Sequence, residues 1–138
     1  MPNDVRQIFG AEIPFANFCG LEELGVVDGR TQLRLTLEPH HLNNLGIAHG
    51  GIVATLLDVA MGTAARTVIG TPVMTLDMNV AFLNPGRGEM IAEGRVLKAG
   101  RSIVFCEAEA KTADGETVAR ATGTLKAARS ADRTEAPK

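Results

Sequence analysis

The chain has 138 residues and a formal net charge of −2, and it contains no Trp or Tyr. A chain of this length fits one domain, which can bury roughly two thirds of its unfolded surface in a single core. The slightly acidic balance and the scarcity of aromatic rings argue against a nucleic-acid partner, because such binding needs a basic surface and often uses stacked rings.

The first 37 residues predict a short helix followed by a hairpin. The helix is expected over residues 4–10. Two runs of strand-forming residues, 21–27 and 31–37, flank Asp28 and Gly29, a dipeptide that favours the tight turn of a β-hairpin. These two runs are therefore expected to form an antiparallel strand pair.

A polar loop over 40–48 precedes the longest predicted element. Apolar and small side chains at helical spacing predict a helix over 50–69 that ends at Gly70, a suitable terminating residue shortly before Pro72. The helix is apolar almost all round, which is typical of a helix enclosed on most sides. Its small residues let neighbouring backbone approach, although Gly62 costs about 1 kcal/mol of helix propensity relative to Ala.

Four strands are predicted after this helix. The first, 73–83, alternates strictly between two faces, and Thr75 falls on the polar face. Its apolar face carries Met74, Leu76, Met78, Val80 and Phe82. Strands over 89–98, 102–112 and 117–127 follow, joined by short turns. This order predicts an antiparallel meander, and the whole series predicts an α+β domain with one central helix.

The ends of the chain and its cysteines bear on location. Residues 1–7 lack the basic and apolar regions of a secretory signal, and no window is expected to reach membrane-spanning length. Cys19 and Cys106 are too few for a disulfide framework or a metal cluster, which favours inert thiols in a reducing compartment. We therefore expect a cytoplasmic single domain over 1–127, no membrane partner, and a disordered tail over 128–138.

Asp58 is the one charged side chain between Gly50 and Ala65. Burying an unpaired carboxylate costs on the order of several kcal/mol, so its place in an apolar helix calls for a reason. The residues alone leave two interpretations open. Asp58 is either a structural acid, paired with a buried Arg or capping a loop, or a catalytic base or nucleophile.

Several motifs stand at fixed spacing around this acid. Asn43 lies six positions before His49, and Asp58 lies nine positions after it. The motifs are Leu42-Asn43, His49-Gly50-Gly51, Leu57-Asp58, Asp77-Met78-Asn79, Phe82-Leu83-Asn84-Pro85, Gly100-Arg101-Ser102 and Ala119-Arg120-Ala121-Thr122-Gly123-Thr124. In this combination the chain resembles the hotdog-fold acyl-CoA thioesterases, particularly the phenylacetic-acid-degradation branch, over about residues 35–126. A His-Gly-Gly triplet alone would carry little weight, because glycine pairs are common in turns.

The resemblance implies a hotdog fold, in which an antiparallel sheet wraps around one central helix. It implies an enzyme that hydrolyses an acyl-CoA thioester to free acid and CoA, with no cofactor, and a homodimer or dimer of dimers with active sites between protomers. Helix geometry gives independent support for a shared site. If position 49 is helical, Asp58 points roughly opposite to it and lies about 13 Å further along the axis, so one chain does not bring them together. A two-fold partner does.

The same resemblance implies roles for individual residues. Asp58 would be the nucleophile or the general base, and the sequence does not choose between them. The N–H of Gly50, in the first helical turn, would donate to the oxyanion, with close packing as the alternative and as the preferred interpretation for Gly51. Asn43 and His49 would line the thioester site or hold the loop against the helix start.

Further expectations concern the edges of the site. Thr75 would assist the attacking water or would be an ordinary strand threonine. Arg101 would meet the phosphates of CoA or would be a solvated turn residue. No set of residues has zinc-ligand spacing, so no metal is expected. The acyl pocket is expected to involve residues such as Met61, Ala65, Met74 or Phe82. A non-catalytic acyl-CoA sensor and, less favoured, an acyl-thioester dehydratase remain as alternative functions.

Overall fold

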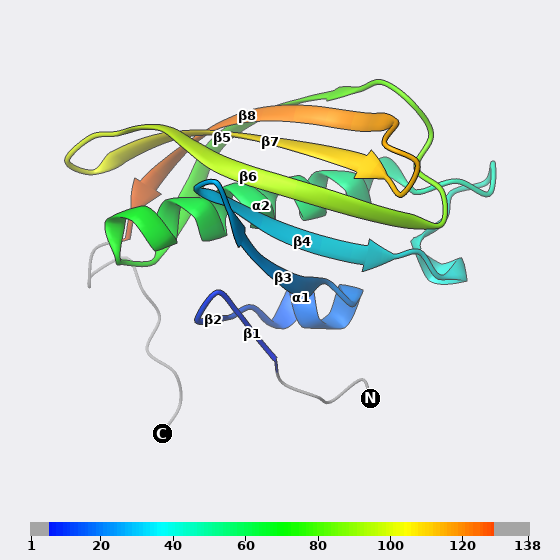
Figure 1. The fold of residues 1–138 in the computed structure, drawn as a ribbon, viewed down its shortest axis with the longest axis horizontal. Helices are drawn as coiled ribbons and strands as arrows, with labels where there is room; N and C mark the ends of the chain where they lie inside the picture. The colour runs from blue at the N-terminus through cyan, green and yellow to red at the C-terminus, as the bar shows by residue number, and fades with distance from the viewer. Residues whose placement is uncertain (1–5, 129–138) are drawn as a thin grey trace.

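A sheet of six antiparallel strands wraps around one long helix in the computed structural model, which describes residues 6–128 (Figure 1). The strands of this sheet are β3 (Glu22–Val27), β4 (Arg30–Thr36), β5 (Val73–Phe82), β6 (Glu89–Ala99), β7 (Ile103–Thr112) and β8 (Thr117–Ala127), and the helix is α2 (Gly50–Ile69). The smaller elements are β1 (Gln7–Ile8), β2 (Ala11–Glu12), α1 (Pro14–Cys19) and the 3₁₀ turn η1 (Pro39–His41). The predicted α+β class and the hotdog arrangement are confirmed.

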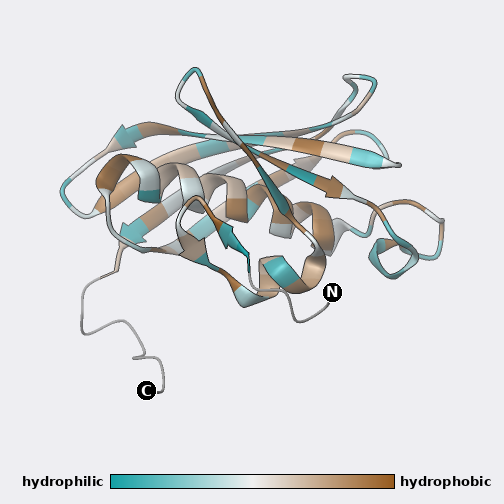
Figure 2. Cartoon of the chain, turned by 60° about the horizontal axis from the view of Figure 1, so that its bottom comes forward, coloured by the Kyte–Doolittle hydropathy of each residue, from teal (hydrophilic) through white to brown (hydrophobic). Residues whose placement is uncertain are grey.

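The bounds of α2 agree with the prediction because both ends have local capping signals. His49 precedes the helix in an extended conformation, and its side chain accepts a hydrogen bond from the Gly51 N–H. Gly70 adopts the left-handed conformation at φ 78° and donates its N–H to the Arg66 carbonyl. From the sequence we expect no segment of membrane-spanning length, but α2, with 20 residues, is long and apolar enough to cross a membrane. In the structure it is the core helix and lies beneath the sheet (Figure 2).

The helix backbone approaches the sheet closely at β4 and β6. The Thr31 hydroxyl donates to the Ala60 carbonyl at 3.0 Å. A Cβ at Gly94 would lie 2.1 Å from the same carbonyl oxygen, so only glycine fits at this position. Small residues therefore set how deeply the helix sits in the curved sheet.

The predicted four-stranded meander is wrong for β5. The strand order is β3-β4-β6-β7-β8-β5, so β5 pairs with β8 at one edge and β6 pairs with β4. The cause lies in the connection over 83–88. It begins with the Leu83 N–H bonded to the Val118 carbonyl and ends with the Gly88 carbonyl bonded to the Leu37 N–H. The connection thus crosses from the start of β8 to the end of β4 instead of closing a hairpin.

Strict alternation along β5 is also wrong, because a bulge lies between Thr75 and Asp77. Before the bulge, Val73 and Thr75 face α2, and after it Met78 packs against the core. Leu76, expected on the core face, is 54% exposed. The bulge therefore turns Thr75 from the predicted outer face toward the helix.

The predicted N-terminal helix is replaced by a small hairpin of β1 and β2 in the described part of the chain. Phe9 and Gly10 form its turn with positive φ. The helix lies later, at α1, where Pro14 occupies the first turn and Gly20 ends the helix in a left-handed conformation. Residues 129–138 of the predicted tail lie outside the described residues.

Candidate functional site

Asp58 lies on the stripe of α2 that the sheet leaves partly open. The Thr75 hydroxyl donates a hydrogen bond to its Oδ1 at 2.6 Å. Among residues 6–128, no Lys or Arg forms an ion pair with this carboxylate. In the described structure Asp58 is therefore not a structural acid neutralised by a buried Arg. The carboxylate instead has one hydroxyl donor and an open side.

A cavity of about 430 Å³ opens beside this pair. Its walls come from the β1–β2 hairpin region, from one face of α2 and from the start of β5. The lining residues are Gly10, Ala11, Glu12, Ile13, Asp58, Val59, Gly62, Thr63, Arg66, Pro72, Val73 and Thr75. The four side chains expected from sequence to line an acyl pocket do not line it. Met61 and Ala65 are fully buried in the core, and Met74 precedes the bulge on the other face of β5.

The start of α2 forms a second cluster. His49 Nδ1 accepts the Gly51 N–H at 2.8 Å, so the histidine caps its own helix. The Gly50 N–H donates to no described residue, as expected for an N–H of the first turn. The Phe82 ring covers this glycine, 3.5 Å from the position that a Cβ would take. At Gly51 a Cβ would lie 3.0 Å from His49 Nδ1, which fits the preference for close packing there.

Asn43 organises the loop that leads into α2. Its Oδ1 accepts hydrogen bonds from the N–H groups of Leu45 at 2.8 Å and of Ile47 at 3.3 Å. This is the side-chain turn that Asn commonly forms. Within the chain the Asn43 side chain therefore stabilises this turn.

The two clusters do not meet within the single chain. Gly50 and Asp58 are eight positions apart on a continuous helix, a rise of about 12 Å. His49 lies in the non-helical capping position, and its ring is turned toward its own helix end. Arg101 is exposed in the β6–β7 turn. That turn lies at the opposite end of the molecule from the start of α2 (Figure 1).

Cysteine and metal chemistry receive no support in the described part of the chain. Burial raises the pKa of the Cys106 thiol to about 11 and also raises the pKa of Cys19, so neither is a ready nucleophile. No group of three His, Cys, Asp or Glu residues within 6–128 is arranged to hold a metal ion.

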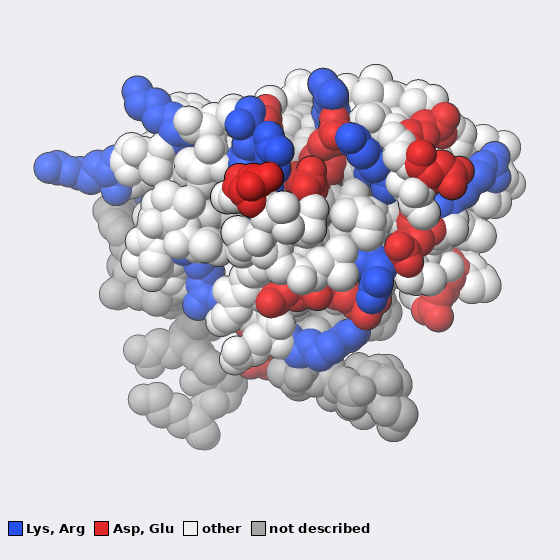
Figure 3. Space-filling model, viewed as in Figure 1, with Lys and Arg blue, Asp and Glu red and all other residues white. Residues whose placement is uncertain are grey.

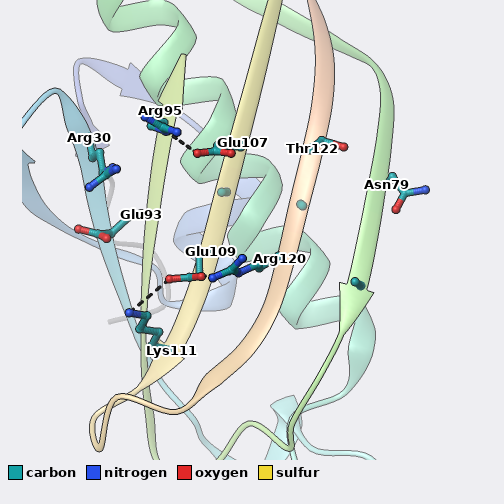
Figure 4. Close-up of a pocket in the computed structure, with 12 residues that line it drawn as sticks. Arg30, Asn79, Glu93, Arg95, Glu107, Glu109, Lys111, Arg120 and Thr122 are labelled. Carbon is teal, nitrogen blue, oxygen red and sulfur yellow. Dashed lines mark hydrogen bonds and ion pairs between the residues drawn. The ribbon is translucent and has the colours of Figure 1, made fainter. Parts of the chain in front are cut away.

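A larger hollow of about 590 Å³ lies on the outer face of the sheet. Two of its ion pairs join neighbouring strands, Arg95 of β6 with Glu107 of β7 and Arg120 of β8 with Glu109 of β7 (Figure 4). Glu109 also pairs with Lys111 on its own strand. Acidic and basic side chains are interspersed over this view of the molecule (Figure 3). Such cross-strand pairs stabilise a solvated sheet face. The hollow is thus a weaker candidate site than the cavity at Asp58.

Comparison with known proteins gives consistent matches. The sequence pattern of the thioesterase superfamily matches residues 45–119. Human acyl-coenzyme A thioesterase 13 is 30% identical over 128 residues, which cover 87% of this chain and 91% of that protein. The structure of the BH2602 protein from Bacillus halodurans with CoA is 34% identical at a TM-score of 0.79, covering 86% of this chain and 80% of that one. The PaaI protein from the phenylacetic acid degradation operon of Escherichia coli has a TM-score of 0.78 at 22% identity, covering 83% and 84% of the two chains, and shares the fold.

Proposed function

Because the chain belongs to the thioesterase superfamily, we propose that it hydrolyses acyl-CoA thioesters to the free acid and CoA. The observation that carries the proposal is the Asp58–Thr75 pair, a carboxylate held by a hydroxyl at the mouth of a cavity. The relative crystallised with CoA supports CoA as the carrier of the acyl group. A cytoplasmic location remains part of the proposal.

In this mechanism the thioester carbonyl points at the Gly50 N–H. That N–H has no intrahelical acceptor and lies at the positive end of the helix dipole, so it stabilises the negative charge that develops on the oxygen. Asp58 either takes a proton from the water that attacks the carbonyl carbon, or attacks that carbon itself to form a mixed anhydride that water then hydrolyses. In both routes the C–S bond breaks and CoA leaves as the thiolate, which takes up a proton. Thr75 holds one carboxylate oxygen, which leaves the other available for this step.

Two protomers are needed to assemble each such site, since Asp58 and Gly50 lie about 12 Å apart on one helix. The support comes from β5. This edge strand exposes Leu76 at 54% and Phe82 at 56%, and a long, apolar, unpaired edge invites another strand.

The positions of the two clusters along β5 suggest how the strands pair. Thr75 contacts Asp58, and Phe82 covers Gly50. An antiparallel pairing of β5 with its copy, centred near Met78, brings Thr75 of one protomer toward Phe82 of the other. It thereby brings Asp58 toward the partner's Gly50, and two-fold symmetry creates two identical sites.

The helix surface agrees with this arrangement. If Asp58 of each protomer faces the partner's Gly50, the two helices cross at the midpoint of these positions, which is Ala54. Ala54 is partly exposed and its side chain is small, so two helix backbones can approach closely there. Association of two such dimers, His49 and Asn43 at the substrate, and Arg101 at the CoA phosphates are further parts of the proposal.

The test is the substitution Asp58→Asn, measured by release of free CoA thiol from a panel of acyl-CoA substrates. We expect the turnover number to fall by about 10²–10⁴-fold, the usual contribution of a general base. Circular dichroism and size-exclusion chromatography should match those of the wild type. Unchanged turnover would remove Asp58 from the mechanism, and binding of acyl-CoA by the wild type without thiol release would favour the sensor alternative.

A further inference from the structure

Gly62 is the least expected residue on the cavity face of α2. It lies midway between Asp58 and Arg66, one helical turn from each, and all three line the cavity. Glycine in the middle of a helix lowers stability relative to alanine, so a glycine at this position calls for a structural or functional reason.

Neither common structural reason applies to Gly62. Its φ is not positive, so no left-handed conformation requires glycine. A Cβ at this position would meet one neighbour, Val73 Cγ2, at 4.0 Å, which is ordinary van der Waals contact. By contrast, a Cβ would lie 2.1 Å from the Ala60 carbonyl oxygen at Gly94 and 3.0 Å from Met61 at Gly123. Packing within the protomer therefore explains those two glycines but not Gly62.

The missing side chain of Gly62 keeps the cavity floor open. The apolar side chains of Ile13, Val59 and Val73 line the cavity next to Gly62. The cavity runs from the Asp58 carboxylate past Gly62 toward Arg66, a rise of about 12 Å along the helix. The Arg66 guanidinium donates to the Phe9 carbonyl at 3.4 Å and ties this far end to the β1–β2 turn.

We infer that Gly62 is a specificity-determining residue, which admits the acyl group of the substrate into the channel between Asp58 and Arg66. This inference rests on the proposed thioester hydrolysis at Asp58. An acetyl group ends before it reaches Gly62, whose position is about 6 Å along the helix from Asp58. An acyl chain of intermediate length passes over Gly62 and ends at Arg66. The substrate class is therefore acyl-CoA with an apolar, medium-length acyl group.

The test compares Gly62→Ala and Gly62→Leu with the wild type, using acetyl-, hexanoyl- and decanoyl-CoA. We expect kcat/KM for hexanoyl- and decanoyl-CoA to fall by about 10-fold or more, the scale on which one methylene discriminates in an apolar pocket, with the larger fall for leucine. The value for acetyl-CoA should change by less than about twofold, and the Tm of Gly62→Ala should rise. Val68→Ala, which trims a 58% exposed helix residue outside the cavity, is the control and should leave the profile unchanged.

A binding measurement separates this inference from the proposed function. Dissociation constants of the same three acyl-CoAs are measured calorimetrically in Asp58→Asn, with and without Gly62→Leu. Weaker binding of the two longer acyl-CoAs alone supports the channel even if the wild type releases no thiol. Equal weakening for all three, no weakening, or a changed oligomeric state of Gly62→Ala in sedimentation would overturn it. A changed oligomeric state would mean that Gly62 contacts a second copy of this chain.

Discussion

At the start of α2, two neighbouring backbone N–H groups differ in whether they are hydrogen-bonded. The Gly51 N–H donates to His49 Nδ1, whereas the Gly50 N–H donates to no described residue. His49 has φ −62° and ψ 139°, an extended conformation that places Gly50 at the first helical position. That position has an N–H without a helical partner, and it also tolerates proline.

Because Gly50 occupies the first helical position, a proline there can remove its N–H without breaking the helix. Gly50→Pro deletes the donor, and the conformation of His49 is the one that a following proline favours. Gly50→Ala retains the N–H, and its Cβ would contact the Phe82 ring at 3.5 Å. We expect Gly50→Pro to lower the turnover number by about 10²–10³-fold and Gly50→Ala to lower it far less. Thiol release measures both, and equal activity in the two variants would exclude this N–H as the oxyanion donor.

At the scale of elements, the contact between α2 and β6 fixes the depth of the helix in the sheet. The Ala60 carbonyl oxygen lies where a side chain at Gly94 would begin. The same carbonyl accepts the Thr31 hydroxyl at 3.0 Å, so a shift of the helix would also weaken this buried hydrogen bond.

Gly94→Ala should therefore be strongly destabilising. Overpacking against a backbone atom typically costs about 1–3 kcal/mol, occasionally more, and here no flexible side chain can move aside. Chemical denaturation measures the loss in unfolding free energy. The matched control is Gly62→Ala, the same substitution on α2 with open space around it, which should not destabilise. Equal stability of the two variants would contradict the close contact.

At the scale of the whole molecule, the proposed active site draws its parts from two chains. Each inactive variant, Asp58→Asn or Gly50→Pro, would lose a different part. A mixed dimer of the two would then hold one site with both lesions and one intact site.

Co-expression of Asp58→Asn with Gly50→Pro should therefore restore activity. Random pairing makes half of the dimers mixed, each with one working site of two, so we expect about one quarter of wild-type turnover. The control pairs Asp58→Asn with the double variant Asp58→Asn/Gly50→Pro, which provides no Asp58 and should stay inactive. Absence of recovery in the first pair would mean that each site lies within a single chain.

Elements whose signals are local can be predicted from the amino-acid sequence. The ends of α2 follow from the His49 and Gly70 caps, and the hairpin at Asp28 follows from its turn residues, because a few adjacent side chains decide both. Asp58 was identifiable because a lone charge in an apolar helix conflicts with its surroundings.

How these elements pack against one another depends on contacts between distant parts of the chain. The pairing of β5 with β8 depends on the path of a connection, and the bulge that turns Thr75 toward Asp58 depends on both neighbouring layers. The cavity and the open floor at Gly62 arise where the N-terminal hairpin, α2 and β5 converge. Residues far apart in the chain create these features together, so no local pattern of side chains encodes them.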